Sequence, residues 1–193
     1  MHPTTPFMPL TDPEIDGFVT SSKEGDKDAF GQLYDHFFDK IYRYVFFRVP
    51  AHDVEDIVET IFIKSWTKMD SYEKRDVKFS SWLFRIAHNA VIDYRRAHKK
   101  VLPMDPRIKD ESIHSAPKKM AEQNLRARQV REAVNQLKEP YRQLVTLKFL
   151  IGLSNSEIAE IMRQREGNVR VMQFRALKQL KNHLSEKDLT FEF

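Results

Sequence analysis

Apolar residues recur along most of the chain at the three- and four-residue spacing of an amphipathic α-helix. In the N-terminal half this spacing predicts helices over residues 30–45, 54–66 and 79–94. Pro50 ends the first of them, the polar stretch 70–78 is predicted to be a loop, and Ser80 or Ser81 is placed to cap the third. Helices with apolar faces of this length need a shared core, which predicts a helical N-terminal domain.

Three prolines between residues 101 and 117 interrupt the helical period, which predicts a linker. Beyond it the helical spacing returns over residues 125–137, 144–150, 158–162 and 169–184. Ser154 or Ser156 can cap the third of these segments, and a turn that ends at Gly167 leads into the fourth, which is basic. A short helix, a turn and a longer basic helix are the order typical of a DNA-binding helix-turn-helix.

The chain shows no convincing strand-like alternation and no internal repeat. The predicted fold class is therefore all-α, with two small helical domains joined by a flexible linker. The predicted divisions are an N-terminal extension at 1–24, a first domain at 25–100, the linker at 101–120, a second domain at 121–185 and a C-terminal tail at 186–193.

Composition excludes several classes of chemistry. The 193 residues include no cysteine, hence no disulfide, thiolate metal site or cysteine nucleophile, and only five glycines, too few for a glycine-rich phosphate loop. His88 and His98 lack a third ligand nearby, so we expect neither a metal nor a cofactor. No export signal and no stretch of roughly 18 apolar residues is found, so we expect a cytoplasmic chain without membrane insertion.

Charge is distributed unevenly, although the formal net charge is only +4. Between Arg85 and Lys100 there are five basic residues and one acidic residue, and between Tyr141 and Leu184 there are eight and three. Lys and Arg bind phosphates by releasing counterions, and aromatic rings beside them can stack on unpaired bases, which favours a nucleic-acid partner for both segments. The alternative is that these charges belong to solvated helix faces.

Two further features of the N-terminal half bear on function. Trp82 fits the apolar stripe of its helix and is expected in the core, whereas Tyr72 lies in the polar loop and is a candidate for base stacking. The second helix starts with four carboxylates among residues 53–59. The helix dipole accounts for one or two of them, and the others leave open an interaction with a basic protein surface.

Two groups of motifs resemble conserved regions 2 and 4 of bacterial sigma factors of the short extracytoplasmic-function type. The first group is DVEDIVETIFIKSW at 53–66 and WLFRIAHNAVIDYRR at 82–96. The second group is LKEPYR at 137–142, GLSNSEIAEIM at 152–162, GNVR at 167–170 and FRA at 174–176. Both groups occur in the family's order, and the resemblance extends from Asp28 to Leu184.

The resemblance implies a promoter-specificity subunit that is not itself an enzyme. Such a subunit binds core RNA polymerase, recognises the minus-35 and minus-10 promoter elements and promotes promoter melting. The resemblance assigns docking on the coiled coil of the largest polymerase subunit to Asp53, Glu55, Asp56, Glu59 and Phe62. The flap of the second-largest subunit and promoter DNA are the other implied partners, and an anti-sigma factor is left open.

The resemblance also assigns residues to the two promoter elements. Those for minus-10 are Lys68, Tyr72, Lys74, Arg85, Asn89, Arg95, Arg96, Lys99 and Lys100. Those for minus-35 are Asn168, Arg170, Gln173, Phe174, Arg175 and Lys178. Asn89 can read the edge of a flipped base, unless its amide bonds locally. Gln164 and Gln173 stand where the family usually has apolar residues, so Met172 could take the place of Gln173 in the core.

A stand-alone helix-turn-helix regulator is the alternative function, for which residues 121–184 would suffice. It leaves the acidic helix unexplained. Such a regulator would bind a palindrome as a dimer, whereas a sigma factor acts as one copy together with core polymerase. A helical enzyme ranks last, because no nucleophile, base and orienting group are found together.

Overall fold

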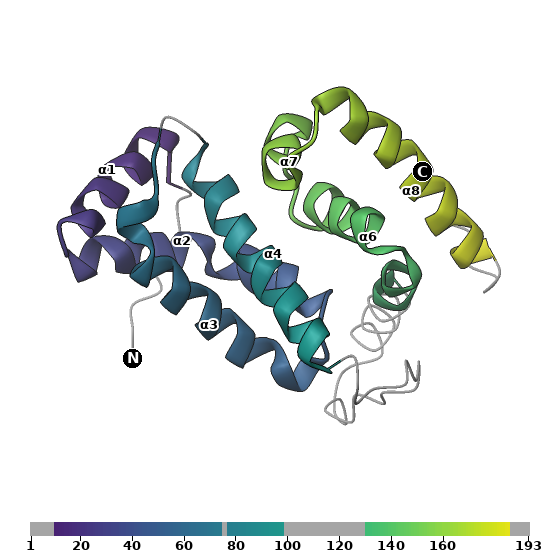
Figure 1. The fold of residues 1–193 in the computed structure, drawn as a ribbon, viewed down its shortest axis with the longest axis horizontal. Coiled ribbons are helices and arrows are strands. Elements are labelled where there is room, and N and C mark those ends of the chain that lie inside the picture. Colours follow the sequence, from purple (N-terminus) through teal and green to yellow (C-terminus); the bar gives the residue numbers. More distant parts are fainter. Residues whose placement is uncertain (1–9, 75–76, 99–129, 186–193) are drawn as a thin grey trace, which may run out of the picture.

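The structure is a computed structural model that describes residues 10–74, 77–98 and 130–185, and it contains two groups of helices side by side (Figure 1). The first group contains α1 (Asp12–Lys23), α2 (Lys27–Phe46), η1 (Ala51–Asp53), α3 (Val54–Thr67), η2 (Met69–Ser71) and α4 (Phe79–His98). The second contains a helix at 130–136, α6 (Glu139–Val145), the π-helical turn η3 (Thr146–Leu150), α7 (Asn155–Met162) and α8 (Glu166–Ser185). No strand occurs in the part of the chain that is described, which confirms the all-α fold class.

One apolar core joins α2, α3 and α4. Asp26 caps α2, because its carboxylate accepts hydrogen bonds from two backbone N–H groups of the first turn at 2.9 and 3.1 Å. Behind this cap, the helical spacing places Phe37 and Ile41 against Ile61 of α3 and Phe84 of α4, and all four side chains are buried. The three helices that the periodicity predicts in the N-terminal half are therefore present and share one core.

A fourth helix of this group, α1, lies where the sequence pattern predicted only an extension. Thr11 and Glu14 form a capping box at its start, with the Glu14 carboxylate accepting from the Thr11 backbone N–H at 2.7 Å. Ile15 and Val19 are buried in the core of the first group. The apolar face of α1 is about two turns long, too short for its period to stand out in the sequence.

The start of α4 differs from the predicted one. Ser80 and Ser81 lie inside the helix, which begins at Phe79, so the prediction that one of them caps it is wrong. The Phe79 ring is buried and packs on the Phe37 and Trp82 rings, with centroid distances of 5.6 and 5.4 Å. The Ser81 hydroxyl instead donates to the carboxylate of Glu160 in the second helical group, at 2.8 Å.

In the second group, α7 and α8 form the predicted helix-turn-helix. The Ser154 hydroxyl accepts from the Glu157 backbone N–H at 3.2 Å, and the Glu157 carboxylate accepts from the Ser154 backbone N–H at 2.8 Å. Ser154, of the two serines that the sequence left open, is therefore the cap of α7. Arg163 ends α7 in the left-handed conformation, with φ of 53°, and this reversal leads the chain into α8.

The two helical groups contact each other through α4 and α7 and through α2 and η3. The Glu139 carboxylate at the start of α6 pairs with the guanidinium groups of both Arg48, which follows α2, and Arg95 on α4. Arg131 donates to the backbone carbonyl of Val49. α8 lies at the outer edge of the second group, with α6 and α7 between it and α4 (Figure 1). The predicted linker at 101–120 falls outside the described residues.

We expect the substitution Ser154→Ala to lower the free energy of unfolding by about 1 kcal/mol, because it removes the capping oxygen of α7. Chemical denaturation followed by circular dichroism measures this change. Ser156→Ala is the matched control, since Ser156 does not accept from the first turn of α7. An equal loss in both variants would contradict the assignment of the cap.

Candidate functional site

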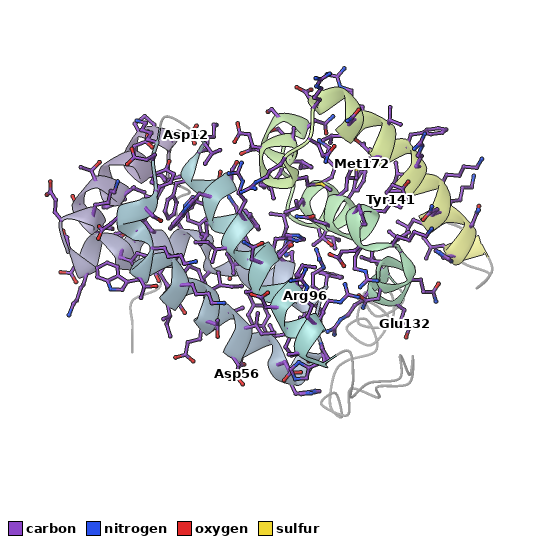
Figure 2. All side chains as sticks on the ribbon, viewed as in Figure 1. Asp12, Asp56, Arg96, Glu132, Tyr141 and Met172 are labelled. Carbon is purple, nitrogen blue, oxygen red and sulfur yellow. The ribbon has the colours of Figure 1, made fainter. Side chains whose placement is uncertain are left out.

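The acidic start of α3 is an exposed surface of the first helical group. Glu55, Asp56 and Glu59 are exposed, and Asp56 projects from the edge of this group that lies away from α8 (Figure 2). Asp53 differs from them, because its carboxylate accepts a hydrogen bond from the Tyr94 hydroxyl at 2.5 Å. Burial, reinforced by this hydrogen bond, raises the pKa of Tyr94. Three of the four predicted carboxylates therefore face solvent, and Asp53 connects α4 to η1.

Beside these carboxylates, α2 and α3 enclose an apolar groove of about 620 Å³. Phe62 is buried in its wall, while Tyr34 and Ile63 are exposed. The residues that line the groove are Phe30, Tyr34, Phe38, Tyr42, Glu55, Val58, Glu59, Phe62, Ile63 and Trp66. The sequence reasoning found Phe62 but missed the aromatic residues of α2, because their helical spacing was interpreted as core alone.

Tyr72 occupies a different environment from the one predicted. Its side chain is only 2% exposed, and its ring packs on the Phe79 and Trp82 rings at centroid distances of 5.5 and 5.4 Å. Its hydroxyl donates to the Val77 carbonyl at 3.0 Å, and burial raises the pKa of Tyr72 to about 12. The expectation that Tyr72 stands outside the core is therefore wrong, because the loop folds back over the start of α4.

The predicted lysines around this loop are on the surface. Lys68 and Lys74 are exposed, and Lys74 forms an ion pair of 2.7 Å with Asp16 of α1. Lys78 forms a similar pair of 2.9 Å with Asp12. Two carboxylates of α1 thus lie against the basic side chains that flank the loop.

The predicted minus-10 residues of α4 fall into two classes. Asn89 and Arg96 are exposed to solvent. Arg85 donates to the Glu160 carbonyl at 2.6 and 3.2 Å, and Arg95 pairs with the Glu139 carboxylate, so both are engaged by the second helical group. Lys99 and Lys100 lie outside the described residues.

The contact between the helical groups concentrates charge. Arg48 has a fully buried side chain, pairs with Glu139 and donates to the Tyr44 hydroxyl at 3.1 Å. Burial, together with the nearby Arg48 charge, lowers the pKa of His88 to about 4. Burial and the Arg95 charge lower the pKa of Arg142 to about 10. The Glu139 carboxylate offsets this accumulation of cations.

α8 presents most of its predicted residues to solvent. Asn168, Arg170, Phe174, Arg175 and Lys178 are exposed. Gln173 and Met172 are both half-buried, and Met172 packs against the core, on the side of α8 that faces α6 and α7 (Figure 2). The Met172 side chain thus supplies the apolar contact at this point of the helix, in the place of Gln173 that the sequence analysis considered for it.

The described residues offer no site for a metal ion formed by three or more His, Asp or Glu side chains. Nor does any helix of the described part have the length and apolar character that crossing a bilayer requires. Three surfaces of the described part are the candidate sites: the groove of α2 and α3, the basic side of α4 and the outer face of α8.

Comparison with known families and proteins shows what the chain is similar to. Residues 33–101 match the family described as Sigma-70 region 2, and residues 127–180 match Sigma-70, region 4. The ECF RNA polymerase sigma factor SigW of Bacillus subtilis is 30% identical over 179 residues, which cover 87% of this chain and 95% of SigW. The ECF RNA polymerase sigma-E factor of Escherichia coli K12 is 34% identical over 174 residues, which cover 85% and 91% of the two chains.

A longer relative and two solved structures extend the comparison. The ECF RNA polymerase sigma factor BldN of Streptomyces coelicolor is 30% identical over 165 residues, which cover 84% of this chain but only 62% of BldN. CnrH, solved with the cytosolic domain of CnrY, has a TM-score of 0.69 at 23% identity and covers 90% of this chain and 98% of CnrH. The sigma factor RpoE of Bartonella quintana, solved with the anti-sigma factor NepR, has a TM-score of 0.64 at 21% identity and covers 83% and 98%. At these identities the two structures establish a common fold.

We expect Glu139→Gln to weaken the contact between the helical groups by about 1 to 3 kcal/mol, because it leaves the buried Arg48 guanidinium and the half-buried Arg95 guanidinium without a counter-charge. Fluorescent labels at Thr60→Cys and Asn182→Cys measure the separation by energy transfer, and the chain has no native cysteine to compete for them. Glu166→Gln, which removes the same charge from an exposed pair on α8, should leave the separation unchanged. An unchanged separation in Glu139→Gln would contradict this role.

Proposed function

The chain belongs to the extracytoplasmic-function group of the sigma-70 family, and we propose from this membership that it directs bacterial core RNA polymerase to promoters. In this role it recognises the minus-35 and minus-10 elements and promotes melting of the promoter duplex, which gives the open complex. The observation that carries the proposal is the presence of both sigma regions, in order, with relatives that match along nearly their whole length. The proposal assigns no catalytic step to the chain and places it in the cytoplasm, where polymerase and DNA are found.

Core polymerase would dock on the apolar groove of α2 and α3, beside the exposed carboxylates of α3. Glu55 and Glu59 lie on its rim and Phe62 in its wall, so the surface combines apolar area with negative charge. A partner helix that presents apolar residues bordered by Lys or Arg fits both properties. The helix dipole would account for acidic residues at the start of α3 but not for an apolar groove that two helices build beside them. The groove therefore supports the assignment of this surface to the basic coiled coil of the largest polymerase subunit.

Promoter melting would use the basic side of α4. Asn89 and Arg96 are exposed there, and Lys68 and Lys74 are exposed around the loop that precedes α4. Side chains that bind phosphates and unstacked bases stabilise the single strand, and this binding free energy offsets the cost of unpairing without nucleotide hydrolysis. Tyr72 does not take part as it is placed, because its ring is inside the core.

The closed arrangement of the two helical groups restrains this step. Arg85 and Arg95 can contact phosphate only after they release the Glu160 carbonyl and the Glu139 carboxylate. DNA and the second helical group therefore compete for the same guanidinium groups. The proposal accordingly includes a separation of the two groups when polymerase and promoter bind, and it predicts weak promoter binding by the chain alone.

A footprinting experiment tests the proposed function. The chain with core polymerase should protect a promoter, chosen by selection with that enzyme, and make minus-10 thymines reactive to permanganate. Neither the chain alone nor core polymerase alone should do so, because each lacks one half of the interaction. Equal protection by the chain alone, as a dimer on a palindrome, would instead support the stand-alone regulator.

The polymerase surface has its own test. The double variant Asp56→Lys and Glu59→Lys should bind core polymerase about tenfold more weakly while keeping its fold, because both side chains are exposed and two attractions become repulsions. Binding is measured by fluorescence anisotropy of the labelled chain. The control is Asp35→Lys with Asp39→Lys, which changes net charge equally on exposed positions that do not line the groove. Equal affinity of the two double variants would rule out a specific docking role.

A further inference from the structure

His88 lies in the middle of the face of α4 that contacts the second helical group. At about 100° per residue, the polar side chains of this face fall within an arc of about 80° around the helix: Ser81, Arg85, His88 and Arg95. Ser81 and Arg85 bind Glu160 of α7, and Arg95 pairs with Glu139 of α6. The half-buried His88 therefore lies at the contact, between side chains that bind the second group before and after it along α4.

A chain of hydrogen bonds from α2 ends on the His88 ring. The Arg48 guanidinium donates to the Tyr44 hydroxyl at 3.1 Å, and the Tyr44 oxygen lies 3.4 Å from Nδ1 of His88. Because this oxygen already accepts from Arg48, its own proton is available for Nδ1, which accepts it only when it carries no proton. A proton on Nδ1 would bring a second donor to the same oxygen. The geometry therefore suits the neutral ring.

The charge around the contact also disfavours a protonated ring. The titratable and charged groups of the four segments that meet there are Tyr44 and Arg48 on the α2 side, Arg85 and Arg95 of α4, Glu139 and Arg142 of α6, and Glu160 of α7. Four guanidinium groups thus share two carboxylates, and a protonated His88 would add a fifth cation. Burial and the Arg48 charge accordingly lower the pKa of His88 to about 4.

We propose that His88 is a proton-sensitive latch of the contact between the helical groups. The neutral ring permits the closed arrangement, and its protonation favours a separation that releases Arg85 and Arg95 from Glu160 and Glu139. The latch is a property of the chain alone, whereas its consequence for promoter melting rests on the proposed function. In that role, acidification would free the basic side of α4.

The direction of the pH dependence follows from the two arrangements. Separation leaves the ring in water, where a histidine takes up a proton with a pKa of about 6.5. Since the closed arrangement binds fewer protons, the contact is fully stable above about pH 6.5 and weakens as the pH falls towards the lowered pKa of His88, about 4.

His36 is another histidine whose pKa is lowered by burial, but it lies elsewhere. Its Nδ1 accepts from the Leu10 backbone N–H at 3.1 Å, within the first helical group. Protonation of His36 would therefore loosen the segment before α1 and leave the contact between the groups unchanged.

The test measures the separation of the groups in the full chain at two pH values. Single-molecule energy transfer between labels at Thr60→Cys and Asn182→Cys gives the ratio of separated to closed chains. From about pH 7.5 to about pH 5.5 this ratio should rise by up to about tenfold, the limit set by a pKa of about 4 in the contact and about 6.5 in water.

Two variants complete the design. His88→Asn places an amide oxygen where Nδ1 can accept from Tyr44 but does not titrate, so it should stay closed and lose most of the rise. His98→Asn removes an exposed histidine from the last turn of the same helix and should keep the rise. Nuclear magnetic resonance follows the same proton directly: the imidazole signal that disappears in His88→Asn should titrate well below the one that disappears in His98→Asn.

Several results would overturn the inference. A ratio that changes less than about twofold would do so, as would an equal rise in His88→Asn or a His88 signal that titrates together with that of His98. Failure of the latch is distinguishable from failure of the proposed function, because these measurements use the chain alone. Promoter protection with core polymerase but a pH-independent separation overturns the latch, and a pH-dependent separation without promoter protection overturns the proposed function.

Discussion

The placement of the two helical groups depends on one carboxylate. Glu139 pairs with Arg48 and Arg95 and lies near Arg142, at 3.9 Å, so it is the counter-charge for three guanidinium groups. Arg48 has no exposed side-chain surface, and a buried cation without a partner is strongly unfavourable. Glu139 itself keeps about a third of its side-chain surface exposed, at 31%, so water can solvate it when the groups separate. The contact therefore depends on a specific counter-charge that stays accessible to water.

This contact covers one of the three candidate surfaces and leaves the other two accessible. Arg85 and Arg95 of α4 are engaged across the contact, whereas the groove of α2 and α3 and the outer face of α8 are uncovered. Polymerase could therefore dock on the closed chain before the basic side of α4 is free. Such an order would keep the proposed melting surface from binding DNA before polymerase is present.

The two uncovered surfaces are both apolar but have opposite surroundings. The groove presents Ile63 and Tyr34 beside carboxylates, and α8 presents Phe174 and Val171 beside Arg and Lys. Apolar area can supply affinity on either surface, while the opposite signs of the neighbouring charges favour a basic partner in one case and an acidic partner in the other. A single small chain can in this way bind two chemically different partners without confusing them.

The sequence by itself determined the longer helices, the helix-turn-helix and the family, because periodicity and motifs are properties of neighbouring residues, whereas the short apolar face of α1 and the start of α4 were not predicted. The exposure of Asp56, Glu59, Asn89 and Phe174 also followed from their place on a helix face. Only the tertiary structure decided that Tyr72 is buried and that Glu139 and Glu160 engage Arg95 and Arg85. The two arginine contacts join residues 44 and 75 positions apart in the chain, and no local pattern records which distant segment will supply the partner. Tyr72 is buried by nearer residues, Phe79 and Trp82, but the helical period did not extend into its loop and so did not predict this contact.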